Sequence, residues 1–150
     1  SWAYAPVGRN FPLTMLRLAK ERDALSVVAD QTGAPTPASL VASITAAAIP
    51  QALANPAKLG LYHLAPIGET SWHGLASYLV AEALAAGAAL RATPDTVQPI
   101  LAADYPARAK RPANSRLDTM KLRTAFGITL PAWQDGIRQL IDTLRAEGRL

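Results

Sequence analysis

The sequence contains no cysteine, which excludes disulfide bonds, thiol nucleophiles and cysteine-ligated metal sites and agrees with a cytoplasmic location. No run of 18 apolar residues occurs, so we expect no membrane-spanning helix. No G-x-G-x-x-G pattern and no P-loop occur, so the chain has no glycine loop of its own to cradle a nucleotide. Aromatic residues make up only 6% of the chain, whereas 50% of it is hydrophobic and 17% is charged. This composition predicts a globular, mainly helical protein.

The residues in and near the stretch GETSWHG raise two possibilities, a serine hydrolase site and a metal site. Ser71 and His73 are close in sequence, but the stretch does not match the G-x-S-x-G elbow of serine hydrolases. A metal site would have to use His63, Glu69 and His73, and two histidines ten residues apart match no ligand motif. We therefore expect neither a hydrolase site nor a bound metal.

The net charge of +4 is distributed unevenly along the chain. Residues 1–104 contain six Lys and Arg against seven Asp and Glu, whereas residues 105–150 contain nine against four. Most of the excess lies in the segment YPARAKRPANSRLDTMKLR, whose cations are Arg108, Lys110, Arg111, Arg116, Lys121 and Arg123. Such a segment indicates either an anionic partner or a solvated basic surface.

Periodicity and turn residues predict an α/β fold with several helices and a few short strands. The expected strands are SWAYA at residues 1–5, SVVA at 26–29, GLYHLAP at 60–66 and a brief one at QPIL, residues 98–101. The expected helices cover residues 11–25 after an N-cap at Asn10, 37–49 with an end or kink at Pro50, 71–86 before Gly87, 118–127, and 131–148. We expect DQTGAPTP, residues 30–37, to form a loop because its glycine and prolines disfavour regular structure. The strands are too few to close a core, so we interpret the chain as part of a larger α/β unit.

Two features favour binding of a phosphate group. The helix that starts in GRNFPLTML presents unpaired N–H groups and a positive dipole end, although in most proteins such a pattern is an ordinary surface helix start. Arg111 in AKRPANS has a guanidinium that can clamp a pyrophosphate through two charge-assisted hydrogen bonds. Neither feature alone identifies a function.

Taken in order, three parts of the chain resemble the dTDP-4-dehydrorhamnose reductases. SWAYAPVGRNF followed by DQTGAPT is similar to that family's S-W-x-Y-G, N-F and D-Q-x-G-x-P-T. GETSWHGLA resembles its G-x-T-S-W-x-x-F-A, and RPANSRLD followed by FGITLPAW resembles its R-P-x-N-S-x-L-D and closing segment. The resemblance spans essentially the whole chain, and Ala5-Pro6 and Leu75-Ala76 are mild departures from it.

The resemblance implies that residues 1–150 are the C-terminal, substrate-binding part of an extended short-chain dehydrogenase/reductase. This part would include the last strands and helices of an incomplete Rossmann unit. The N-terminal half would then supply the NADPH or NADH loop and the catalytic Thr and Tyr-x-x-x-Lys. No tyrosine here is followed by Lys four residues later, so we assign no catalytic residue and expect no cofactor on this chain alone.

The resemblance also implies four substrate-binding residues. Trp2 corresponds to the tryptophan that contacts the dTDP-sugar, and Asn10 and Phe11 correspond to a helix start near the nucleotide. Arg111 corresponds to an arginine on the phosphate side. The expected partners are therefore a dTDP-sugar and the N-terminal Rossmann half.

Two alternative functions remain open. One is a stand-alone helical module that binds an anionic partner such as nucleic acid through the basic C-terminal segment, although aromatic and basic residues do not interleave there. The other is half of a related epimerase or dehydratase, which usually carries R-D-x-x-x-V in place of DQTGAPT.

The aromatic start of the chain predicts an exposed apolar face near Trp2 and Tyr4, where the N-terminal half would pack. Exposed apolar faces favour association. We expect the chain to form a homo-oligomer through this face.

Overall fold

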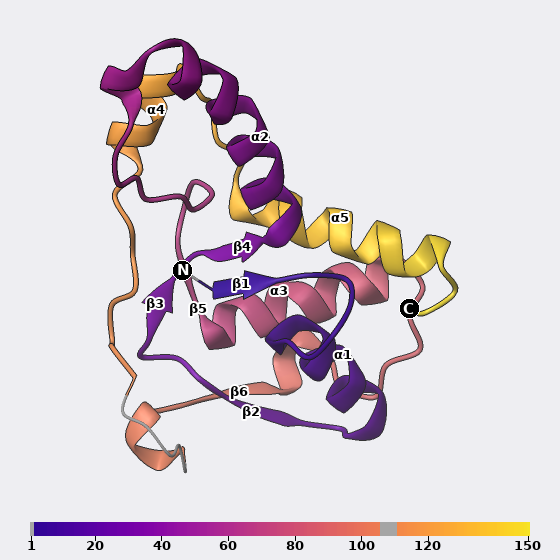
Figure 1. The fold of residues 1–150 in the computed structure, drawn as a ribbon. Coiled ribbons are helices and arrows are strands. Elements are labelled where there is room, and N and C mark those ends of the chain that lie inside the picture. The colour runs from indigo at the N-terminus through magenta and orange to yellow at the C-terminus, as the bar shows by residue number, and fades with distance from the viewer. Residues whose placement is uncertain (1, 106–110) are drawn as a thin grey trace.

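The computed structural model describes residues 2–105 and 111–150, so Arg108 and Lys110 of the basic segment lie outside the described residues. The α-helices are α1 (Phe11–Glu21), α2 (Ala38–Ala54), α3 (Trp72–Ala85), α4 (Met120–Phe126) and α5 (Trp133–Ala146). The strands are β1 (Trp2–Tyr4), β2 (Leu25–Val28), β3 (Thr32–Gly33), β4 (Pro35–Pro37), β5 (Thr70–Ser71) and β6 (Val97–Ile100). Short 3-10 helices are η1 (Pro56–Lys58), η2 (Pro94–Thr96) and η3 (Ala102–Asp104). Figure 1 shows that α2 and α4 extend away from the other elements.

Helix α3 lies at the centre of the molecule and contacts α1, α5, β2 and β6 (Figure 1). Its buried side chains are Leu75, Ala76, Leu79, Val80 and Ala83. The Oγ atom of Ser71 accepts a hydrogen bond from the backbone N–H of Gly74 at 3.0 Å and caps the helix start. A helix that is apolar on most sides needs neighbours around it, which explains its central place.

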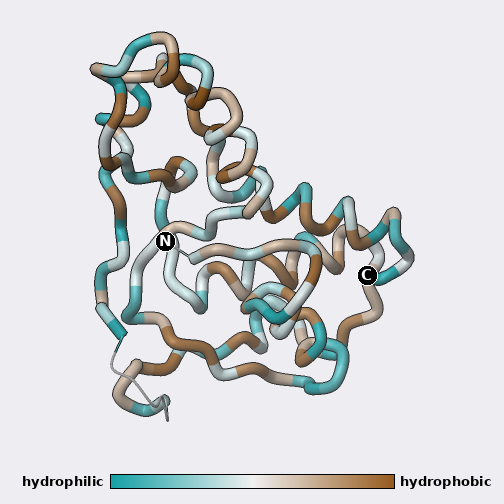
Figure 2. The backbone as a smooth tube through the Cα atoms, in the orientation of Figure 1, coloured by the Kyte–Doolittle hydropathy of each residue, from teal (hydrophilic) through white to brown (hydrophobic). Residues whose placement is uncertain are grey.

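Helix α5 packs one face on the core and exposes the other, because its apolar residues recur at helical spacing. Figure 2 shows hydrophobic and hydrophilic residues alternating along it. The buried face contains Trp133, Gly136, Ile137, Leu140, Ile141 and Leu144. Gly136 allows close packing, because a Cβ atom there would lie 2.6 Å from the Tyr4 hydroxyl and 3.0 Å from Cγ of Pro37.

The described strands form three separate pairs. β1 pairs in parallel with β4, with Trp2 opposite Pro35 and Tyr4 opposite Pro37. β2 pairs in parallel with β6 over four residues, and β3 pairs antiparallel with β5. Each strand is therefore an edge strand within the described chain, and such short pairs need helices packed on them to be stable.

Two of the predicted strand and loop assignments are wrong. DQTGAPTP contains β3 and β4, because its two prolines occupy alternate positions of an edge strand, where proline is tolerated. GLYHLAP contains no strand. Its Leu61 side chain is 77% exposed, and Tyr62 instead packs its ring edge-on against Phe126.

Helix boundaries also differ from the prediction in two places. α1 ends at Glu21, because Leu25 belongs to the buried strand β2. α2 continues through Pro50 to Ala54 and contains no buried residue.

The expectation that Tyr4 belongs to an exposed face is wrong, because only 5% of Tyr4 is exposed, whereas Trp2 of the same expectation is half-buried. Its side chain is covered by α5 at Gly136.

Among the described helices, none combines the length and apolarity that crossing a bilayer requires.

Candidate functional site

Three aromatic rings meet beside the N-terminal ends of two helices. The indole of Trp2 on β1 stacks on the indole of Trp72, with 3.7 Å between ring centroids and 15° between planes. Phe11 lies against the same Trp72 ring, with centroids 4.7 Å apart. We call Trp2, Phe11 and Trp72 the ring cluster. All three are half-buried, so the cluster packs against the core and remains in contact with solvent.

Helix capping places two of these rings. Phe11 is the first residue of α1 and directly follows the N-cap Asn10. Trp72 is the first residue of α3 and directly follows the N-cap Ser71. Because each cap fixes where its helix begins, the two helix starts bring Phe11 and Trp72 into contact, and Trp72 also contacts Trp2 of β1.

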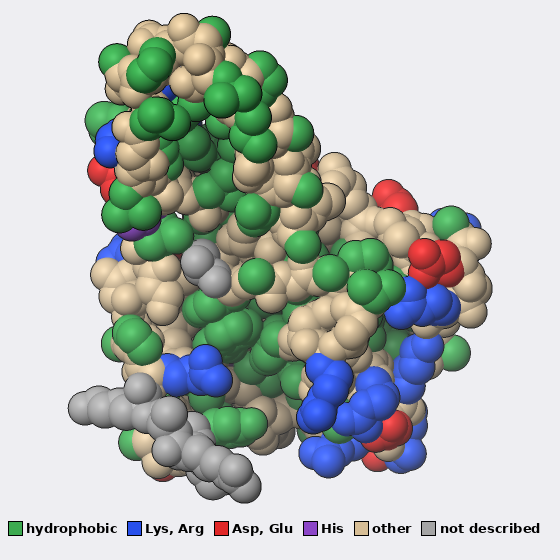
Figure 3. Space-filling view, viewed as in Figure 1, with side chains coloured by type: hydrophobic (Ala, Val, Ile, Leu, Met, Phe, Trp, Pro, Cys, Tyr) green, Lys and Arg blue, Asp and Glu red, His purple; other side chains and the backbone are tan. Residues whose placement is uncertain are grey.

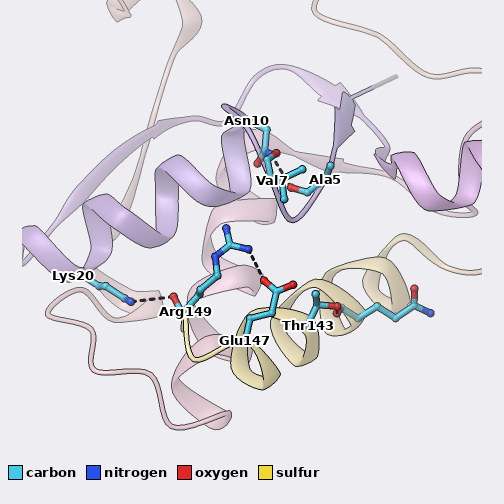
Figure 4. Close-up of polar contacts among 8 residues, drawn as sticks. Ala5, Val7, Asn10, Lys20, Thr143, Glu147 and Arg149 are labelled. Atoms are coloured by element: carbon cyan, nitrogen blue, oxygen red, sulfur yellow. Dashed lines mark hydrogen bonds and ion pairs between the residues drawn. The ribbon is translucent and has the colours of Figure 1, made fainter.

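Asn10 uses its side chain to build the α1 start (Figure 4). Its Oδ1 atom accepts a hydrogen bond from the backbone N–H of Leu13 at 3.1 Å. Its Nδ2 atom donates to the carbonyl oxygens of Ala5 at 2.8 Å and Val7 at 3.3 Å. Both polar ends of the amide therefore bind the protein, and Asn10 positions Phe11 through the helix it caps.

The segment that contains Arg111 runs beside β3. The backbone N–H of Thr32 donates to the carbonyl of Ala113, and the N–H of Ser115 donates to the carbonyl of Thr32, both at 2.8 Å. β3 in turn pairs with β5, the strand that leads into Trp72. Residues 111–115 are therefore connected to the ring cluster by way of β3 and β5. Arg111 lies on this segment and is exposed.

The neighbouring Arg116 is held by two acceptors. Its guanidinium forms an ion pair with Glu69 at 3.0 Å, and its Nε atom donates to Oδ1 of Asn114 at 3.0 Å. Lys121 farther along donates to the carbonyl of Leu61 at 2.8 Å and lies over the Tyr62 ring. These two cations of the basic segment therefore stabilise the fold locally.

Other cations are paired with acids at the surface. Figure 3 shows Lys and Arg side chains over α1 and near the C-terminal end, with acidic side chains among them. Ion pairs join Arg17 to Glu21 and Arg91 to Asp23. Arg149 pairs with Glu147, and Lys20 donates to the carbonyl of Arg149 (Figure 4). This face is therefore a mixed surface that carries charges of both signs.

The histidines do not converge on a common centre. His73 lies on α3, and its Nε2 atom donates to the carbonyl of Val97 at 2.8 Å, which joins α3 to β6. Within residues 2–105 and 111–150, no group of three or more His, Cys, Asp or Glu side chains is arranged to hold a metal ion.

The four predicted site residues thus have different surroundings. Trp2 and Phe11 meet in the ring cluster, Asn10 caps α1, and Arg111 lies on the segment beside β3. Trp72 was not among the predicted site residues. The N-cap serine before it was the available signal, since that cap places residue 72 at the start of a helix.

Fold and site together define an α/β, mainly helical domain that carries a cluster of aromatic rings at its surface. The chain belongs to the RmlD substrate binding domain family, whose model matches residues 1–146. It is 49% identical over 141 residues to the dTDP-4-dehydrorhamnose reductase of Salmonella typhimurium strain LT2, covering 94% of this chain and 46% of that protein. It is 47% identical over 144 residues to the Escherichia coli K12 enzyme of the same name, covering 96% and 48%.

A solved structure agrees with this assignment. The Bacillus anthracis dTDP-4-dehydrorhamnose reductase in complex with NADP superposes with a TM-score of 0.82 and 31% identity, over 95% of this chain and 46% of that one. The chain therefore spans about half the length of the relatives it matches.

The residues of this chain do not fit a dinucleotide cofactor. No glycine-rich loop occurs in the sequence. At the N-termini of α1 and α3, the side chains of Asn10 and Ser71 each bind a backbone N–H group that a phosphate would otherwise use.

Proposed function

We infer that this chain is the sugar-nucleotide-binding part of a cytoplasmic, NADPH-dependent dTDP-4-dehydrorhamnose reductase that serves dTDP-rhamnose synthesis. The observation that carries the proposal is the meeting of Trp2, Phe11 and Trp72 beside the segment of Arg111. The names of the relatives support it.

Each side chain would contact a different part of the substrate. The indole of Trp2 offers a flat apolar face and one N–H donor, which suit a deoxysugar. Phe11 would lie at the nucleotide, and Asn10 would hold the helix start that presents it. Arg111 would bind the pyrophosphate through charge-assisted hydrogen bonds.

The remaining chemistry belongs to the N-terminal half, which we propose as the partner of this chain. NADPH bound there supplies the hydride. This chain would hold the sugar with its reacting carbon toward the cofactor. It would thereby contribute to catalysis by positioning and orienting the substrate.

The test follows NADPH absorbance with the 150-residue chain, with the separately expressed N-terminal half of the same protein, and with their mixture. We expect turnover of dTDP-4-dehydrorhamnose only in the mixture, because this chain has neither a glycine loop nor a Tyr-x-x-x-Lys pair. Turnover by the chain alone would overturn the proposal.

Arg111→Ala in the mixture tests the phosphate contact. We expect it to weaken transition-state binding by about 1.5–3 kcal/mol, the typical value of a hydrogen bond to a charged group. Arg145→Ala on the exposed side of α5 is the matched control. Steeply salt-dependent binding of nucleic acid, with no preference for dTDP-sugars, would favour the alternative function.

A further inference from the structure

The Trp2 indole is held by two neighbours that come from distant parts of the chain. Trp72 stacks on it at 3.7 Å between centroids. Gly33 lies against the same ring, because a Cβ atom built at residue 33 would be only 2.6 Å from Cε2 and 2.8 Å from Cζ2 of Trp2. These contacts involve the rigid ring of an indole that is itself packed, so an added methyl group cannot fit without moving the ring.

The two neighbours are also joined to each other. Gly33 pairs with Thr70 in the β3–β5 ladder, and Thr32 pairs with Ser71, the N-cap of α3. The ladder therefore fixes the position of Trp72, the first residue of α3, relative to Gly33. Trp2 reaches the same place from β1, whose N–H group at residue 2 donates to the carbonyl of Ala34 at 3.2 Å.

We propose that Gly33 and Trp72 are positioning residues that hold the Trp2 indole in one orientation for the sugar nucleotide. The inference rests on the proposed function for its ligand, but the orientation of the ring can be measured without one. An indole has few rotatable bonds, so a stack on one side and a bare backbone beside it leave the ring little freedom. Ligand affinity then depends on residues 33 and 72 because preorganisation lowers the entropic cost of binding.

The first experiment measures the stack directly by circular dichroism of the 150-residue chain. Two stacked indoles couple their electronic transitions, and we expect a couplet that both Trp2→Phe and Trp72→Phe abolish. Trp133→Phe is the matched control, because Trp133 packs edge-on against Tyr78 and belongs to no indole pair. A couplet that is absent from the unmodified chain, or that survives Trp72→Phe, would overturn the inference.

The second experiment measures binding of dTDP-rhamnose, which carries the deoxysugar that Trp2 would contact, by calorimetry, using the chain and then the chain mixed with its N-terminal half. We expect Trp72→Ala to weaken binding about tenfold, which corresponds to about 1.4 kcal/mol. Trp72→Phe should restore most of the affinity because it keeps a flat ring under Trp2, although it removes the couplet. Equal affinity of Trp72→Ala and the unmodified protein would overturn the positioning role.

Gly33→Ala gives an independent test through a double-mutant cycle with Trp2→Ala. Alone, Gly33→Ala should reduce the couplet and weaken dTDP-rhamnose binding about tenfold, a change of about 1.4 kcal/mol. In the Trp2→Ala background it should have no further effect on binding, since the ring that it displaces is gone. Additive losses would contradict the proposal and indicate a general disturbance of β3.

Failure of the proposed function gives a different result. In that case neither the chain nor the mixture binds dTDP-rhamnose, while the couplet and its response to Gly33→Ala remain. Loss of the couplet response with intact dTDP-rhamnose binding rejects only the positioning role.

Discussion

Tyr4 of β1 places its phenol ring and hydroxyl group in the hydrophobic core. Its hydroxyl is buried and has no hydrogen-bond partner among the described residues. An unpaired buried hydroxyl costs free energy, so Tyr4→Phe should raise the free energy of unfolding by about 1 kcal/mol, measured by urea denaturation. Tyr62→Phe is the control, because the Tyr62 hydroxyl donates to the carbonyl of Lys58 at 2.7 Å and its loss should destabilise by about 1 kcal/mol. Equal destabilisation by both substitutions would contradict the prediction.

The same substitution has a second readout at alkaline pH. Burial raises the pKa of Tyr4 above its ordinary value of 10.0. Above that pH the unfolded chain releases the phenol proton while the folded chain keeps it, so stability falls as pH rises toward the folded-state pKa. We expect the unmodified chain to lose stability more steeply above about pH 10 than Tyr4→Phe does. Parallel pH profiles would exclude Tyr4 as the cause.

At the scale of elements, α2 is an uncharged helix of 17 residues with proline inside it. Proline removes a backbone hydrogen bond and is about 3 kcal/mol less favourable than alanine in a helix interior. Pro50→Ala should therefore increase the protection of α2 amides in hydrogen exchange by about 1–3 kcal/mol. Pro56→Ala at the start of η1 is the control and should change protection by less than about 0.5 kcal/mol, because the first turn needs no N–H group there. Lower protection after Pro50→Ala would contradict this expectation.

At the scale of the whole molecule, exposed apolar side chains gather on the part that contains α2, η1 and α4 (Figure 3). The large ones there are Val41, Ile49, Leu53, Leu59, Leu61 and Met120. We expect the chain alone to bind a hydrophobic dye and to self-associate through this surface. Leu53→Glu combined with Leu61→Glu should reduce both effects in sedimentation and dye-binding experiments. Leu101→Glu, at another exposed leucine, is the control and should leave them unchanged. A monomer without dye binding would contradict the prediction.

Much of the helical fold could be predicted because its signals are local. Asn10 and Ser71 cap α1 and α3, and the apolar spacing of α5 matches its buried face. The site could be predicted less completely. The resemblance pointed to Trp2 and Phe11, but only the structure places Trp72 between them.

The sequence by itself determined the family, through its motifs. It also determined the helix starts and the buried face of α5, because a helix closes its hydrogen bonds and its capping contacts within a few residues. Only the tertiary structure decided which extended segments became strands. Pro35–Pro37 forms β4 because β1 lies beside it, whereas residues 60–66, with better strand propensity, form none. The ring cluster was decided in the same way, since its rings come from β1, α1 and α3. A strand and a ring stack take their partners from distant segments, and local sequence does not specify that proximity.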